Sequence, residues 1–381
     1  MMKRIAFLLA CLGLAGDVLG EDISVGTEPR RYEELDESFY NASFLSWAGN
    51  NLADRLNLAD AAAADARATR LAEIGVTGVL YNGRHFRRSY PGEYDLIEKY
   101  GRIVVEACHC HGIKVVEHHE FTVFSYASYP RMLAHVDWLQ TDVRTGEPWR
   151  WACIHNPDFL KAYGDYLASF AERTRPEGYM LDEIGFVSPN PCGCPYCRAT
   201  YRAALDKPFP VWTQGEGSCD DPDFRNIVRW RSKLTPRAQQ TVMERIREVR
   251  PDAMNMKYCS DYADPGIAAR AIDLTAHVAR YSPFMGWECM VAEAVNGWRP
   301  FLRALKLRLS YGNYYDNPVW SLNREMTSRE ATYVGWALCQ AGKHSVWFGR
   351  KALQTDEDLD AFARYSIWPH VMPVAIEGGI S

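Results

Sequence analysis

Short apolar runs alternate with amphipathic stretches from residue 44 to near the end of the chain. The short runs, rich in β-branched and aromatic residues, predict buried strands, and the longer stretches with helical periodicity predict helices. The predicted strands are 44–47, 76–81, 113–117, 178–181, 253–258, part of 279–287, 313–320 and 344–348. The predicted helices are 58–74, 94–110, 158–172, 196–205, 225–250, 266–277, 298–309, 328–341 and 356–365.

This order of elements predicts the fold class. Strands that alternate with helices form βαβ units and a parallel sheet, and eight such units over this length are typical of a (β/α)8 TIM barrel. No Gly-x-Gly-x-x-Gly follows any predicted strand, so the sequence does not support a dinucleotide-binding fold. We therefore expect residues 44–381 to form an α/β barrel, with an excursion at 206–223 over one of its faces.

The first twenty residues have the pattern of an export signal. Lys3 and Arg4 precede an apolar run at 5–16 that is too short to span a bilayer, and small residues lead to Gly20. We expect cleavage near Gly20, an N-terminal extension at 21–43, and a secreted or periplasmic protein with no transmembrane segment. The alternative is lipidation at Cys11, which follows Ala10 as in a lipobox.

Composition narrows the partners. The chain of 381 residues has a formal net charge of −5, which argues against a nucleic-acid partner because such domains are usually basic. Aromatic residues make up 13%, and an excess of aromatic rings is one way in which proteins stack on sugars. Aromatic rings mostly form core, so composition alone is compatible with a carbohydrate substrate without favouring it, and it leaves open whether the chain forms a homo-oligomer.

Polar and charged residues cluster where the predicted strands end, which is where barrel enzymes build their active sites. Acids, histidines and arginines that meet on one face suggest an active site. The candidates are Arg84, His85, Glu117-His118-His119-Glu120, Asp182, Glu183, Glu288, Asp316 and Arg350. Trp47, Trp287, Trp320 and Trp347 lie near strand ends and could provide a stacking platform for sugar rings.

Four cysteines have a spacing suited to a metal. Cys192, Cys194 and Cys197 form a C-x-C-x-x-C cluster, and Cys153 precedes it by one predicted helix and strand. Four thiolates make a closed, tetrahedral, structural zinc site. In an exported protein the alternatives are disulfide bonds or free thiols.

These motifs resemble the barrel of glycoside hydrolase family 42 β-galactosidases and of the related hypothetical glycosyl hydrolase group. The matching segments are Cys153-Ile-His-Asn156-Pro157, Asp182-Glu183 and Cys192-Gly-Cys194-Pro-Tyr-Cys197. The resemblance implies a zinc ion on the four cysteines, no organic cofactor, and Glu183 as general acid/base. Asp182 replaces the family's Asn, and the nucleophile of strand seven has no clear counterpart, so Glu288 or Asp316 is assigned as nucleophile or base.

A more distant resemblance is to the retaining α-L-fucosidases. There the nucleophilic Asp at the end of strand four corresponds to Asp182, and a later acid corresponds to Glu288. The histidine pair that holds the sugar in those enzymes is similar to His118-His119, although it stands on a different strand. This resemblance implies Asp182 as the nucleophile and Glu288 as the acid/base.

Glycoside cleavage requires two carboxyl groups on either side of the bond. Adjacent strand residues point to opposite faces, so we expect only one of Asp182 and Glu183 to touch substrate, and only one of His118 and His119 to reach sugar hydroxyls. We predict an exported glycoside hydrolase acting on oligo- or polysaccharides. The other hypotheses are a carbohydrate-binding barrel that has lost a catalytic acid, and a metal-dependent hydrolase or lyase using His118 or His119.

Overall fold

The computed structural model describes most of the first two thirds of the chain and four strands beyond it. The described residues are 44–47, 60–81, 94–120, 132–182, 184–186, 192–211, 220–232, 234–259, 284–290, 306, 310, 319–324 and 345–348. Among them, no helix is long and apolar enough to cross a membrane.

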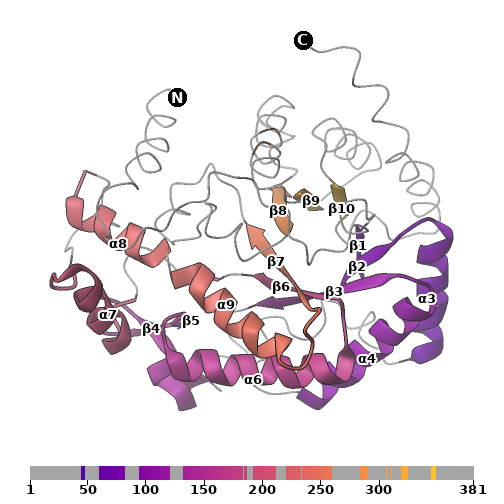
Figure 1. Cartoon of the computed structure of the whole chain (residues 1–381), viewed down its shortest axis with the longest axis horizontal. Coiled ribbons are helices and arrows are strands. Elements are labelled where there is room, and N and C mark those ends of the chain that lie inside the picture. The colour runs from indigo at the N-terminus through magenta and orange to yellow at the C-terminus, as the bar shows by residue number, and fades with distance from the viewer. Residues whose placement is uncertain are drawn as a thin grey trace, which may run out of the picture.

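Eight parallel strands form a closed barrel (Figure 1). They are β1 (Phe44–Trp47), β2 (Gly78–Tyr81), β3 (Lys114–Glu120), β6 (Gly178–Asp182), β7 (Met254–Cys259), β8 (Phe284–Met290), β9 (Val319–Arg324) and β10 (Ser345–Phe348), which pair in this order. The first and last strands close the ring, with Phe44 beside Trp347 and Leu45 beside Phe348. The predicted fold class, a (β/α)8 TIM barrel, is confirmed.

Helices cover the described part of the barrel wall on the outside: α3 (Ala61–Glu73), α4 (Tyr94–Cys110), α6 (Pro157–Thr174) and α9 (Leu234–Arg247). Figure 1 shows α3, α4, α6 and α9 following one another around the wall. The core between wall and helices is aliphatic and aromatic, with Phe159, Leu167, Leu181 and Val242 fully buried.

An antiparallel hairpin interrupts the barrel pattern between β3 and α6. It consists of β4 (Leu139–Thr141) and β5 (Pro148–Ala152), preceded by the 3-10 helix η2 (Leu133–Trp138). Its turn is held by Asp142, whose Oδ1 accepts hydrogen bonds from the backbone N–H groups of Arg144 (2.8 Å) and Thr145 (3.1 Å). This hairpin has no counterpart among the elements predicted from the sequence.

Most element positions agree with the sequence prediction. The strand at 44–47 and the helix at 94–110 have the predicted bounds. The helical region 225–250 is instead two helices, α8 (Pro222–Ser232) and α9, and α7 (Pro195–Leu205) precedes them. The predicted helices beyond residue 260 lie almost wholly outside the described residues, as do residues 1–43, so the signal segment and N-terminal extension stay predictions.

Two strand predictions were wrong in ways that matter for the site. The third strand, predicted to end at residue 117, continues to Glu120, so His118 and His119 lie within it. The seventh strand was placed at 313–320, whereas β9 begins at Val319. Asp316 therefore precedes this strand in the chain and does not stand at its C-terminal end.

Candidate functional site

At β3 and β6 the barrel wall has an inner face towards the barrel interior and an outer face towards the helices. Register partners in a parallel sheet point to the same side, and successive residues alternate. His119 contacts the ring of Phe170 on α6 and the ring of Tyr179 on β6, with ring centroids 5.8 and 5.5 Å apart. Glu117 and His119 on β3, with Tyr179 and Leu181 on β6, thus face the helices, and His118, Met180 and Asp182 face the barrel interior.

His118 and Asp182 form the polar centre that the structure places inside the barrel. The Nε2 atom of His118 lies 2.9 Å from Oδ2 of Asp182, and both side chains are mostly buried, with exposures of 7% and 14%. Asp182 is the last residue of β6, so the pair lies at the C-terminal end of the strands. A carboxylate held by an imidazole can act as an acid, a base, a nucleophile or a hydrogen-bond acceptor for substrate.

His119 is a correction to the predicted substrate-binding set. Its side chain is fully buried between the barrel wall and α6, and burial lowers the pKa of its imidazole well below the usual value. It therefore cannot reach a ligand in the mouth. The metal-dependent alternative retains only His118 of the two histidines, and within the described residues the four cysteines are the one cluster with metal-binding geometry.

The remaining predicted site residues divide between strand positions and undescribed positions. Glu183, Asp316, Arg84, His85 and Arg350 lie outside the described residues. For Glu288, Trp47, Trp287, Trp320 and Trp347 the structure gives the strand position but not the side chain.

The strand positions bear on the roles predicted for Glu288, Trp47 and Trp320. Glu288 stands in the C-terminal half of β8, and Trp47 is the last residue of β1, as a role at the mouth requires. Trp320 is the second residue of β9 and so lies at the opposite end of its strand, which removes the reason for assigning it to the stacking platform.

Placing β9 correctly also identifies a residue that the sequence analysis missed. The strand itself, Val-Trp-Ser-Leu-Asn-Arg, contains no acid, but Glu325 follows its last residue, Arg324, directly in the chain. The signal was present in the sequence. The predicted strand at 313–320 ends before β9 does, so the prediction gives Glu325 no place at a strand end.

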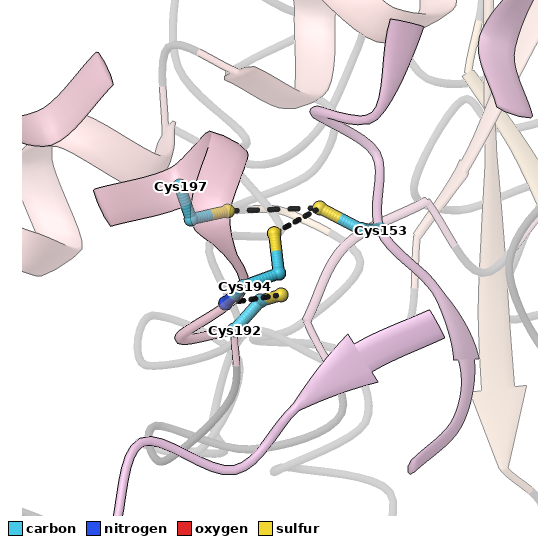
Figure 2. Close-up of side chains that lie close together, drawn as sticks. All are labelled: Cys153, Cys192, Cys194 and Cys197. Carbon is cyan, nitrogen blue, oxygen red and sulfur yellow. Dashed lines mark hydrogen bonds between the residues drawn. The ribbon is translucent and has the colours of Figure 1, made fainter. Parts of the chain in front are cut away.

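The four cysteines form a second centre beside the barrel (Figure 2). Cys153 follows β5, Cys192 and Cys194 stand before α7, and Cys197 lies in its first turn. The Sγ atom of Cys153 is 3.6 Å from those of Cys194 and Cys197, and all four Sγ atoms lie within 4.8 Å of one another. These cysteines are free and buried.

This geometry suits a tetrahedral metal ion. Four sulfurs around zinc, each bonded at about 2.3 Å, would stand about 3.8 Å apart. The Sγ of Cys192 also accepts hydrogen bonds from the backbone N–H groups of Thr141 and Cys194, both at 3.4 Å. Hydrogen bonds from neighbouring thiols, Cys153 foremost, lower the pKa of Cys194. The described cluster could therefore hold a metal ion.

Hydrogen bonds through the hairpin join the cysteine loop to the segment that follows β6. The buried Gln140 on β4 donates from Nε2 to the carbonyl oxygens of Ala152 and Gly185, both at 2.9 Å. The backbone N–H of Gly193 donates to the carbonyl of Thr141 at 2.6 Å. The hairpin is thus fixed on one side to the cysteine loop and on the other to residues 184–186, directly after the candidate acids.

The chain was compared with protein families, curated proteins and solved structures. No family model and no curated protein matches the chain. Solved structures, in contrast, do match the chain. The glycoside hydrolase domain of PgaB (BpsB) from Bordetella bronchiseptica is similar with a TM-score of 0.62 at 12% identity, covering 87% of this chain and 98% of that one.

Two further neighbours correspond to the two resemblances found in the sequence. Gan42B, a GH42 β-galactosidase from G. stearothermophilus, has a TM-score of 0.61 at 11% identity, covering 86% of this chain and 56% of that one. α-L-Fucosidase isoenzyme 2 from Paenibacillus thiaminolyticus has a TM-score of 0.54 at 10% identity, covering 89% and 50%.

The chain has the fold of the glycoside hydrolase barrels. It spans little more than half the length of the β-galactosidase and half of the fucosidase. At identities of 10–12% the likeness establishes the architecture, and the chemistry depends on the residues at the mouth.

Proposed function

We propose that this protein is an exported glycoside hydrolase that cleaves O-glycosidic bonds of oligo- or polysaccharides. The observation that carries the proposal is the His118–Asp182 pair, which lies inside a barrel of glycoside hydrolase fold at the end where such enzymes act. Asp182 then contacts substrate or supports the acid beside it, and His118 holds its carboxylate in place.

The proposed catalytic pair consists of one acid at the end of β6 and one from β8 or β9. In the assignment similar to family 42, Glu183 is the general acid/base, and the nucleophile is Glu288 or Glu325. In the assignment similar to the fucosidases, Asp182 is the nucleophile and Glu288 the acid/base. Asp316 is the weakest candidate, because it precedes β9 in the chain.

Kinetics on two classes of substrate separate these assignments. An acid/base variant keeps its first step on an aryl glycoside with an acidic leaving group such as 2,4-dinitrophenol, because that leaving group needs no proton. A nucleophile variant loses activity on every glycoside. The variants are Asp182→Asn, Glu183→Gln, Glu288→Gln and Glu325→Gln. On a glycoside whose leaving group needs a proton, we expect kcat/KM to fall by at least a thousandfold for each true member of the pair.

Glu172→Gln is the matched control, because Glu172 is exposed on the outer helix α6. It should retain wild-type activity. If all four mouth variants keep wild-type activity on glycosides that the protein cleaves, the carboxylate mechanism is wrong.

A carbohydrate-binding barrel without catalysis is the second candidate. The absence of any acid within β9 favours it, since family 42 enzymes place their nucleophile on this strand. Binding of oligosaccharides measured by calorimetry, together with no turnover on a broad panel of aryl glycosides, would identify a binder.

We also propose that the cysteine cluster holds a structural zinc ion. Its four sulfurs suit a closed site that fixes the hairpin and α7 and leaves no position for substrate. Elemental analysis of protein purified without chelators should give one zinc per chain. Cys153→Ser should reduce this content sharply.

Export is proposed from the first twenty residues alone. N-terminal sequencing of protein recovered from the medium or periplasm should begin just after Gly20, and a lipidated chain beginning at Cys11 would contradict this.

A further inference from the structure

Arg231 is a fully buried arginine next to the cysteine cluster. It lies on α8, has no exposed surface, and is among the largest fully buried side chains of the described residues. Its guanidinium carbon stands 4.6 Å above the ring of Phe186. Burial lowers the pKa of Arg231 to about 10, and the nearby sulfurs of Cys197, Cys192 and Cys153 act in the opposite direction.

Aromatic contacts fix α8 against the segments that carry the cysteines. The ring of Trp230 contacts His155, two residues after Cys153, with centroids 5.6 Å apart. The same ring contacts Tyr201 on α7, the helix that carries Cys197, at 5.3 Å. Arg231 is the next residue along α8, so the packing of Trp230 also holds the backbone of Arg231 near these segments.

A buried guanidinium is costly unless negative charge lies near it. Four thiolates around a divalent ion carry a formal charge of about −2. A cation at this position therefore lowers the free energy of the metal-loaded cluster, and the loaded cluster lowers the cost of burying the arginine. Neutral thiols would provide much less of this stabilisation.

The same side chain reaches towards the catalytic end of β6. Phe186 is fully buried and lies four residues after Asp182, within the segment whose Gly185 carbonyl is bound by Gln140. A cation over an aromatic face is attracted by the ring quadrupole, and more strongly so when both groups are away from water. Arg231 thus contacts Phe186 in the segment after Asp182 and lies near the cysteine cluster.

We propose that Arg231 is a positioning residue that compensates the negative charge of the metal-loaded cysteine cluster and holds the segment after Asp182 in place through Phe186. This inference rests on the proposed metal site. It predicts that metal affinity depends on a residue that is not a ligand.

The test measures metal affinity directly. Wild type, Arg231→Met, Arg231→Lys and the control Arg229→Met are compared by chelator competition for Zn²⁺ and by titration with Co²⁺. Arg231→Met should bind about 10- to 100-fold more weakly, as found when other residues that support metal ligands are changed. Arg231→Lys should recover most of this loss because it keeps the charge, and Arg229→Met, on the same helix but not fully buried, should match wild type.

Cobalt adds a readout that a purely structural role would not change. Removing a nearby cation raises the energy of the thiolate electrons, so the sulfur-to-cobalt charge-transfer bands of Arg231→Met should move to longer wavelength. Unchanged affinity and unchanged bands in Arg231→Met would overturn the inference. If Arg231→Met does not fold, Arg231→Lys and Arg231→Gln are compared, and equal affinities would overturn it.

Failure of the metal proposal can be distinguished from failure of the role proposed for Arg231. Wild-type protein that binds neither Zn²⁺ nor Co²⁺ would reject the metal site itself and the role of Arg231 with it. Wild-type protein that binds both ions, while the Arg231 variants bind equally well, would reject the role of Arg231 alone.

Discussion

Neighbouring residues on β3 have opposite environments, and this decides which of them can act. His118 points into the barrel towards Asp182, and His119 packs against Phe170 on α6. Glu117, two residues before His119, faces the same buried layer and is fully buried. A chemically suggestive run of Glu-His-His-Glu thus supplies one described side chain to the barrel interior and two to the outer core.

Glu117 yields a pH prediction. Burial raises the pKa of its carboxyl well above the usual value, so the free energy of unfolding falls as pH rises above the unfolded pKa of about 4.3. Glu117→Gln removes the ionisable group and should increase the free energy of unfolding at pH 7 by about 1–3 kcal/mol. The gain should disappear as pH falls towards 4.

Urea unfolding at pH 4, 5.5 and 7 measures this difference. The exposed Glu172→Gln should stay within about 0.5 kcal/mol of wild type at each pH. A wild-type protein more stable than Glu117→Gln at pH 7 would show that the carboxylate is stabilised in its charged form.

At the scale of elements, the start of α6 connects the segment that carries Cys153 to the outer helices of the barrel. Asn156 is the N-cap and is fully buried. Its Oδ1 accepts the backbone N–H groups of Asp158 (2.9 Å) and Phe159 (3.0 Å), and its Nδ2 donates to the carbonyl of Asp137 (2.8 Å). The side chain of Asn156 thus bonds both η2 and the first turn of α6, and Asn156 itself lies three residues after Cys153.

Asn156→Ala should lower the free energy of unfolding by about 1–2 kcal/mol, because two helix N–H groups and one buried carbonyl lose their partner. Asn156→Asp keeps the acceptor and loses the donor, so it should lie between wild type and Asn156→Ala. Thermal and urea unfolding measure both variants. Equal stability of Asn156→Ala and wild type would show that water replaces these bonds.

Metal removal should act on the same elements before it affects the barrel. The cluster joins the end of β5 to α7, so its loss should free the hairpin turn, where Arg144 is partly exposed. We expect cleavage by trypsin after Arg144 to become at least tenfold faster on chelation, as open segments are cut in proportion to their population. Cys153→Ser should be cut quickly with or without zinc, and an unchanged rate in wild type would argue against a structural metal.

At the scale of the whole molecule, the barrel is closed by its last strand. β10 pairs with β9 on one side and with β1 on the other, so segments some 300 residues apart in sequence complete one sheet. Closure removes both sheet edges, which would otherwise expose unpaired backbone groups.

A chain that ends at residue 343 lacks β10 and leaves the edges of β9 and β1 open. It should lose cooperative unfolding and form aggregates, whereas the full chain should elute as a discrete species. Size-exclusion chromatography and near-ultraviolet circular dichroism measure both properties. A truncated chain with a cooperative transition would show that the other strands form a stable open sheet.

The sequence by itself determined the architecture and the cysteine site. Strand and helix periodicity is a local property, so it survives in the sequence and predicted the alternation over most of the described chain. The metal-ligand spacing of Cys192, Cys194 and Cys197 is equally local. Cys153 lies 39 residues before Cys192 in the chain, and the structure brings its sulfur to 3.6 Å from those of Cys194 and Cys197.

Only the tertiary structure decided which polar residues meet. Whether His118 or His119 faces the interior depends on how the helices pack against β3, and the C-terminal end of β9 depends on its register with β8. Arg231 has no sequence signal as a partner of the cysteines, because it lies on a separate helix, 34 residues after Cys197 in the chain. Long-range packing, which no local pattern encodes, therefore determined the candidate site.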